Sequence, residues 1–190
     1  MHVSKPGTDR HTAPMSTDPT IEPDTKDWTW VLQRPCPECR VDVSAVPPEE
    51  IARRLLANAE RWRGVLGRAD VSSRPEPGVW SALEYACHVR DVHRVFATRV
   101  RAMQDTDDPL FENWDQDAAA VQGRYGDQQP ARVADELVTS AADVASAYAR
   151  VDGPAWDRPG RRSNGSLFTT TSLARYHLHD VEHHLVDVAG

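Results

Sequence analysis

The segment Trp80-Ser-Ala-Leu-Glu84 marks the start of a long helix and is the clearest local signal in this 190-residue sequence. A Ser followed three residues later by a Glu forms a capping box, in which each side chain accepts a hydrogen bond from the other residue's backbone N–H. Trp80 precedes the cap and can pack against Tyr85 as a hydrophobic staple. Hydrophobic residues then recur at helical spacing from Leu83, which predicts a helix that continues to about Met103.

Three further segments show the same helical spacing of hydrophobic residues. One begins after Pro47-Pro48-Glu49-Glu50, where prolines and acidic residues suit a helix start, and it stops at Gly67. The next runs from about Pro130 to Val151, before the break Asp152-Gly-Pro154, and the last from about Thr171 to Val188. With no convincing strand pairs, the sequence predicts an all-α fold, a four-helix bundle.

The connections between these helices are predicted to be loops. The loop at 109–129 includes a short helix near Gln116–Gln122, and the loop at 156–170 includes Ser163-Asn-Gly165-Ser. Residues 1–27 are rich in Pro, Thr and Asp, which predicts a disordered leader before a single domain at 28–190. The N-terminal part of that domain carries the Cys36-Pro-Glu-Cys39 motif.

Charge and hydropathy narrow the class of protein. The formal net charge of −7 argues against a nucleic-acid partner, which would need a basic face to meet phosphates. No apolar run approaches the ~20 residues needed to cross a bilayer, and the leader lacks the apolar core of a secretory signal. We therefore predict a cytoplasmic protein without a membrane partner. The sequence contains no nucleophile elbow, P-loop or dinucleotide fingerprint. The partner that we expect is a small-molecule substrate.

The segment Tyr176-His-Leu-His-Asp-Val-Glu-His-His184 holds four of the eight histidines. His179 and His183 are spaced i, i+4, so they share one face of the last helix and could hold one metal ion. His184 points about 100° away from His183, and His177 points almost opposite His179, so neither is expected to bind the same ion.

The second long helix can supply a third ligand, His88, which shares an inward face with Tyr85 and Val92. Three neutral imidazoles would leave a coordination position open, as catalytic sites do. The alternative is that these histidines form a solvated face or satisfied polar groups in the core. Acidic neighbours could accept the second ring N–H of a ligand, and arginines could bind a cofactor or substrate carboxylate. The acids are Asp91, Asp180 and Asp187; the arginines are Arg90, Arg94 and Arg175.

Cys36-Pro-Glu-Cys39 is half of a zinc knuckle, and no second CxxC or CxxH completes it. Three interpretations stay open: a reversible dithiol, a metal site completed by a distant His, or a loop whose cysteines have no special role. Cys87 is most simply a small core residue.

Two of these stretches together resemble a known family. Trp80-Ser-Ala-Leu-Glu-Tyr-Ala-Cys-His88 is similar to the W-S-x-x-E-x-x-x-H signature of the DinB/YfiT-like superfamily, and His179-Asp-Val-Glu-His183-His184 to its H-x-x-x-H-H signature. The stretch Gly165-Ser-Leu-Phe-Thr resembles the actinobacterial branch, and the likeness covers roughly residues 28–188. The resemblance implies an up-down-down-up four-helix bundle, a homodimer, and a divalent metal on His88, His179 and His183.

The family includes thiol-dependent S-transferases such as the bacillithiol transferases, and the mycothiol-dependent maleylpyruvate isomerase, in which a Glu takes the position of His179. The resemblance therefore implies a metal-dependent enzyme in which a low-molecular-weight thiol, mycothiol in an actinobacterium, attacks a small electrophile. Zinc and nickel are the expected metals, and manganese and iron the alternatives. Two rival hypotheses are a hydrolase or lyase with water in place of the thiol, and a non-enzymatic metal-binding or redox-sensing bundle.

Overall fold

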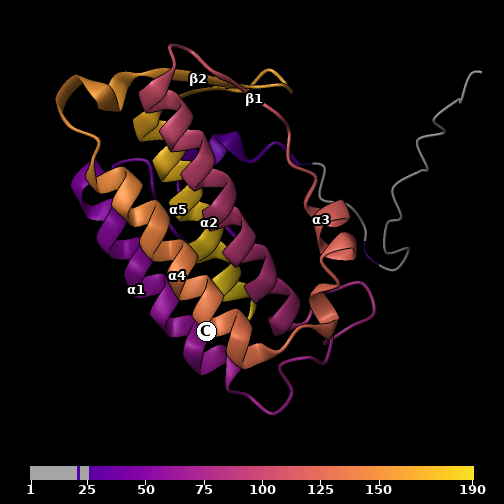
Figure 1. Ribbon diagram of the computed structural model, residues 1–190. Helices are drawn as coiled ribbons and strands as arrows, with labels where there is room; N and C mark the ends of the chain where they lie inside the picture. Colours follow the sequence, from indigo (N-terminus) through magenta and orange to yellow (C-terminus); the bar gives the residue numbers. More distant parts are fainter. Residues whose placement is uncertain (1–20, 22–25) are drawn as a thin grey trace, which may run out of the picture.

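The computed structural model describes residues 21 and 26–190, so the predicted leader at 1–27 lies almost entirely outside the described residues. Four long helices dominate the described chain (Figure 1). Each begins and ends within about three residues of the boundary that the sequence predicts. They are α1 (Pro48–Leu66), α2 (Ala82–Asp105), α4 (Pro130–Ala149) and α5 (Thr170–Asp187).

The helix starts are built from local chemistry. Ser81 and Glu84 form the predicted capping box of α2, and the rings of Trp80 and Tyr85 lie 5.5 Å apart, edge to face. Thr169 and Ser172 form a second capping box at the start of α5. Proline occupies the first turn of α1 and of α4, where its missing N–H leaves no hydrogen bond unmade.

The four long helices pack in the order α1, α4, α2, α5 around the bundle, and α5 closes the ring against α1. The ends of α2 and α4 lie at the same end of the bundle as the start of α5 (Figure 1). Arg68, just after α1, hydrogen-bonds to the carbonyl oxygens of Val188 and Ala189, so α1 and α5 end together. This confirms the four-helix bundle, with α1 and α5 running one way and α2 and α4 the other.

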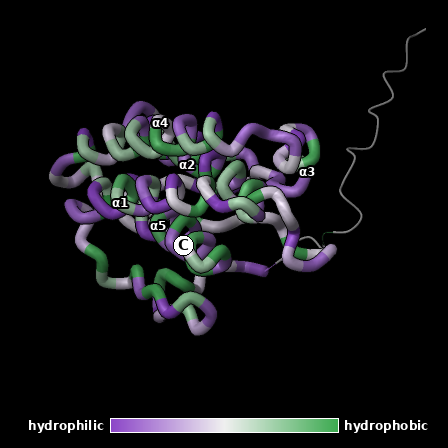
Figure 2. The backbone as a smooth tube through the Cα atoms, turned by 90° about the horizontal axis from the view of Figure 1, so that it is seen from below, coloured by the Kyte–Doolittle hydropathy of each residue, from purple (hydrophilic) through white to green (hydrophobic). Residues whose placement is uncertain are grey.

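The core lies between these helices, and the hydrophobic residues that define the predicted helical stripes are buried there. Trp62 of α1, Leu83 of α2, Leu137 of α4 and Leu178 of α5 are among the fully buried side chains. Figure 2 shows the four long helices grouped together, with the short helix α3 (Gln116–Gln122) to one side. Within residues 21 and 26–190, no helix has the length and apolar character that a membrane crossing requires.

A small three-stranded sheet covers one end of the bundle, where the sequence predicts only loops and no strand pairs. Strand β2 (Pro159–Arg162) pairs in parallel with β1 (Leu110–Phe111) and antiparallel with β3 (Leu167–Thr169). The prediction of loops without strand pairs was wrong here, because strands of two to four residues are too short to show an alternating pattern in the sequence. The Asn164-Gly165 pair forms the hairpin turn, with Gly165 at a φ of 95°, which an L-residue rarely adopts.

Candidate metal centre

Helix α5 presents two pairs of metal-binding side chains in successive registers. His179 and His183 form one i, i+4 pair, and Asp180 and His184 form the next. Because each residue turns the helix by about 100°, the two pairs face different neighbours. Asp180 and His184 face His88 on α2, whereas His179 and His183 face the N-terminal segment that carries Cys36 and Cys39.

The first cluster, the acid–imidazole site, consists of His88, Asp180 and His184. One donor atom of each residue lies within 4.8 Å of the others. Nε2 of His88 is 3.5 Å and Nε2 of His184 is 3.8 Å from Oδ1 of Asp180. Ligands about 2.0–2.2 Å from one divalent ion lie roughly 3–3.5 Å apart, so a small adjustment would let all three bind it.

Two residues of this site, His88 and Asp180, have buried donor atoms without the hydrogen bonds that buried polar atoms require. Among the described residues, no hydrogen bond of normal geometry reaches either ring nitrogen of His88 or Oδ1 of Asp180. His88 is 1% exposed. Leaving such atoms unpaired costs about 1–3 kcal/mol each, so the site is incomplete as a purely structural feature.

Electrostatics favour the ligand forms of these side chains. Burial lowers the pKa of His88, which keeps its imidazole neutral, despite the nearby Asp180. Burial alone would raise the pKa of Asp180, but the imidazole of His88, 3.5 Å from its Oδ1, and that of His184 hold this pKa well below the ordinary 3.8. A carboxylate beside the neutral imidazole of His88 carries one negative charge and suits a divalent cation.

Aromatic rings enclose the acid–imidazole site. The ring of His88 lies 5.4 Å from Trp80 and 5.5 Å from Trp114, with which it is stacked. Tyr85 packs against His184 at 5.2 Å. Tyr85 and Trp114 also line the cavity, so these rings form part of its wall beside the site.

The second cluster, the thiol–imidazole site, consists of Cys36, Cys39, His179 and His183, again with donor atoms within 4.8 Å of one another. Sγ of Cys36 is 3.8 Å from Nδ1 of His183, and Sγ of Cys39 is 3.7 Å from Nε2 of His179. Burial raises the pKa of the Cys39 thiol to about 11.

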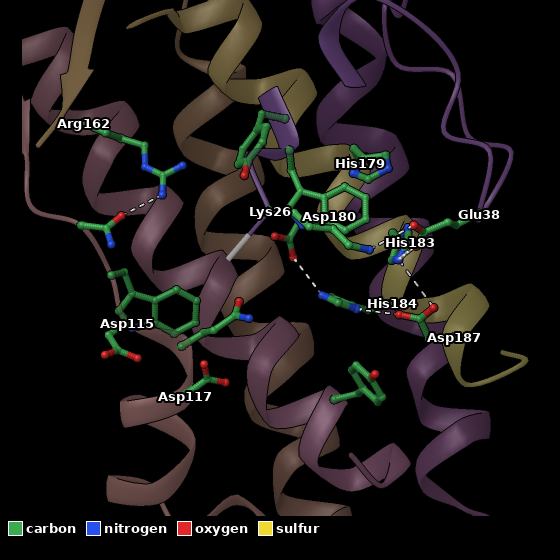
Figure 3. Close-up of a pocket in the computed structure, with 16 residues that line it drawn as sticks. Lys26, Glu38, Asp115, Asp117, Arg162, His179, Asp180, His183, His184 and Asp187 are labelled. Atoms are coloured by element: carbon green, nitrogen blue, oxygen red, sulfur yellow. Dashed lines mark hydrogen bonds and ion pairs between the residues drawn. The ribbon is translucent and has the colours of Figure 1, made fainter. Parts of the chain in front are cut away.

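Asp187 connects the two clusters (Figure 3). Its carboxylate accepts a hydrogen bond from Nδ1 of His184 at 2.9 Å and lies 3.6 Å from Nε2 of His183. One carboxylate therefore orients an imidazole in each cluster, as acceptors behind metal-bound histidines do.

A cavity of about 530 Å³ opens beside both clusters. Asp180 and His184 line it from α5, and Trp28 and Glu38 line it from the N-terminal segment. In Figure 3, Arg162 of β2 lies across the cavity from Asp187. Its Nη2 donates to Asn113 at 2.8 Å, while its buried Nε has no partner among the described residues. A fixed guanidinium facing a site of this kind can bind an anionic substrate group.

The structure divides the predicted ligand set of His88, His179 and His183 between the two clusters. His88 joins Asp180 and His184, whereas His179 and His183 join the two cysteines. The remaining histidines of the bundle, His93 and His177, are buried in the core and lie 3.0 Å apart, Nδ1 to Nε2.

Arg90 and Arg175, two of the three arginines predicted to bind a cofactor or substrate carboxylate, do not contribute to the cavity lining. Arg90 is buried and bonds Gln128 and Glu136 at 2.7 and 2.9 Å. Nε of Arg175 donates to the carbonyl oxygen of Val46. Both side chains hold helices and loops together.

Sequence reasoning missed Arg162 and assigned Asp180 and His184 no ligand role. The i, i+4 spacing of Asp180 and His184 was visible, but so was that of His179 and His183, and spacing alone does not choose between them. No local pattern marks Arg162, because it reaches the cavity only through the pairing of β2 with β1.

Comparisons with known proteins agree with this architecture. The sequence model of the DinB superfamily matches residues 65–187. Among solved structures, the chain is similar to YfiT from Bacillus subtilis, described as a probable metal-dependent hydrolase with an unusual four-helix bundle topology, with a TM-score of 0.62. The two are 12% identical over 83% of this chain and 89% of YfiT, so this likeness concerns the fold. No curated protein sequence matches the chain significantly.

Proposed function

This chain belongs to the DinB superfamily, and from its acid–imidazole site we propose that it is a metal-dependent enzyme that transfers a low-molecular-weight thiol to a small electrophile. The observation that carries the proposal is the set of buried donor atoms on His88 and Asp180 that make no hydrogen bond among the described residues, beside a cavity that Asp180 and His184 line. Three protein ligands beside a cavity leave room for a substrate, as in catalytic metal sites.

His88, Asp180 and His184 would hold the ion, replacing the ligand set predicted from the sequence. A divalent metal there lowers the pKa of a thiol, so that the thiolate forms near neutral pH. Asp187 orients His184 through its hydrogen bond to Nδ1, and Trp114 keeps water from one side of His88. The thiol proton passes to solvent, the sulfur bonds the electrophilic carbon, and the leaving group departs with its bonding electrons.

The carboxylate in the site supports a thiol cosubstrate. The resemblance gives maleylpyruvate isomerase one acidic ligand, a Glu at the position of His179, and in this chain the acidic residue of the site, Asp180, is one residue later. The ligand set of this chain is thus closer to that branch than three imidazoles would be. The cavity, at about 530 Å³, is large enough for a sugar-linked thiol such as mycothiol beside a small substrate.

The test is an assay of thiol consumption by untagged protein loaded with zinc, nickel or manganese. Mycothiol and a chloro-dinitrobenzene electrophile should give a metal-dependent thioether product, and Asp180→Asn should abolish it. Glu182→Gln is the matched control, because Glu182 lies on the same helix but pairs with Arg54 at 2.6 Å. No product with any thiol and metal, from protein that binds metal at His88, would overturn the thiol-transfer proposal.

The description of YfiT favours a second candidate, a metal-dependent hydrolase. The same three ligands would serve it, with water in place of the thiol. Hydrolysis of an ester or amide without added thiol, lost in Asp180→Asn, would favour this candidate.

Homodimer formation, implied by the resemblance, stays a prediction that sedimentation can test.

A further inference from the structure

We propose that Cys36, Cys39, His179 and His183 form a second, structural zinc site that fastens the N-terminal segment to α5. It is independent of the proposed function, because it shares no ligand with the acid–imidazole site. The sequence leaves the CxxC motif half complete, and the fold brings it to an i, i+4 histidine pair 140 residues away.

The distances match tetrahedral coordination. With Zn–S bonds of about 2.3 Å and Zn–N bonds of about 2.0–2.1 Å, a tetrahedron has S···N edges of roughly 3.6 Å. The two S···N contacts in the structure are 3.8 and 3.7 Å, longer than that edge by only 0.1–0.2 Å. Two thiolates and two neutral imidazoles also cancel the charge of Zn²⁺ and are the ligands that zinc prefers over harder cations.

The cysteine loop has the folded turn that a zinc knuckle needs. The N–H of Arg40 donates to the carbonyl oxygen of Cys36 at 2.8 Å, and the N–H of Cys36 donates to Val41 at 2.9 Å. Arg40 has a φ of 63°, a left-handed conformation that a non-glycine residue adopts only at a cost of about 1 kcal/mol. This turn brings both sulfur atoms to the same side of the loop, toward α5.

The surroundings of the histidines suit a closed structural site. While Nδ1 of His183 faces a sulfur, its Nε2 faces the carboxylates of Glu38 at 3.8 Å and Asp187 at 3.6 Å. Such an arrangement fixes the ring and strengthens the ligand nitrogen. Trp28 covers the rings of His183 and His179 at 5.2 and 5.8 Å, and Cys36 is 1% exposed.

The site has a consequence for the cavity. The segment that it holds contributes Lys26, Trp28 and Glu38 to the cavity wall. Zinc binding would therefore keep one wall of the cavity in place without entering it, because all four coordination positions are filled by protein.

The first test is metal content by mass spectrometry of untagged full-length protein. We expect Cys36→Ser/Cys39→Ser to lose about one zinc per chain relative to wild type. Cys87→Ser is the matched control, because Cys87 is also buried but lies on α2 beside Tyr125, and it should keep the wild-type content. Equal zinc content in all three proteins would overturn the proposal.

The second test uses the wild-type protein, so its outcome does not depend on whether a variant folds. In wild-type protein with cobalt in place of zinc, a thiolate-to-cobalt charge-transfer band should appear, and thiol reagents should modify Cys36 and Cys39 only after chelation. Absence of the band, with both cysteines equally reactive before and after chelation or joined in a disulfide, would overturn the proposal.

The variants separate this proposal from the proposed function. His88→Ala should keep the charge-transfer band and lose thiol transfer. Loss of the band in His88→Ala would contradict two independent sites. Failure of thiol transfer by the wild-type protein, with the band intact, would count against the proposed function alone.

Discussion

The acid–imidazole site and the thiol–imidazole site use consecutive residues of α5, yet they differ in partner and in the number of protein donors. The first completes its donor set with His88 from α2, and a cavity leaves room for another ligand. The second takes two cysteines from the N-terminal segment and has four protein donors. One is suited to substrate chemistry and the other to holding the chain.

A step of one residue along a helix changes the neighbour that a side chain faces, and that neighbour sets the role of the side chain. His183 and His184 are the same residue type, adjacent in sequence, and both face Asp187. Their roles diverge because a turn of about 100° aims one at a thiol and the other at a carboxylate. Substitutions in the acid–imidazole site and in the thiol–imidazole site should therefore change metal binding and stability independently of each other.

The largest effect is expected from His88→Ala. Losing a direct ligand should lower metal affinity at the acid–imidazole site, and thiol transfer, by more than the ~10–100-fold typical of an orienting partner. Titration with cobalt and an activity assay measure both. His177→Ala is the control and should leave metal affinity unchanged, because His177 is buried against His93 instead. Equal losses of metal affinity in the two variants would contradict the role of His88 as a ligand.

Cys39→Ser should act on stability. At a free zinc concentration of 100 times the dissociation constant, binding adds about 2.7 kcal/mol to the free energy of unfolding. In a domain of this size, that corresponds to a rise of roughly 5–11 °C in unfolding temperature. Calorimetry with and without chelator measures it. Wild type and Cys87→Ser should lose this increment on chelation, whereas Cys39→Ser should show only the smaller response of the acid–imidazole site; a response equal to wild type would contradict the structural role.

Asp187→Asn tests the link between the sites. We expect a loss of about tenfold or more in metal affinity at the acid–imidazole site, since the amide orients His184 less strongly than the carboxylate does. The thiol–imidazole site should change less, because Glu38 also faces His183. Asp143→Asn, which alters an exposed carboxylate on α4, is the control for charge. Equal losses at both sites would mean that the sites are not separable.

Arg162→Lys should raise KM for an anionic substrate about tenfold with little change in kcat, since a charged hydrogen bond to the substrate is worth about 1.5–3 kcal/mol. Arg161→Lys is the neighbouring control, because Arg161 is paired with Asp108 and does not line the cavity. Steady-state kinetics on both variants decide whether the guanidinium binds substrate; a change in kcat alone would exclude that role.

The smallest effect is expected from Glu84→Gln, one turn before His88. Burial opposes ionisation of Glu84, but Arg74 and Ser81 hold its pKa below the ordinary 4.5. A depressed pKa in the folded state gives stability that is present above pH 4.5 and lost as pH falls through the folded value. Glu84→Gln should cost about 1 kcal/mol at pH 7 and flatten that acid dependence in denaturant titrations. An unchanged acid limb would exclude Glu84 as its source.

Much of the bundle follows from local signals that survive without tertiary context. The capping box at Ser81 and Glu84, the prolines before α1 and α4, and the hydrophobic stripes predict the long helices closely. The sheet could not be predicted, because its strands are too short for a pattern and depend on pairing between distant segments.

For the candidate sites, the possible metal ligands can be read from the sequence alone. They are a histidine on α2, overlapping i, i+4 donor pairs on α5, and a CxxC motif without a second pair of ligands nearby in the sequence. Only the tertiary structure decided which donors meet. The spacing of His179 and His183 equals that of Asp180 and His184, and nothing local says which pair faces α2. That choice depends on the rotation of α5 in the bundle and on the N-terminal segment packing beside it, both set by contacts between residues far apart in the chain.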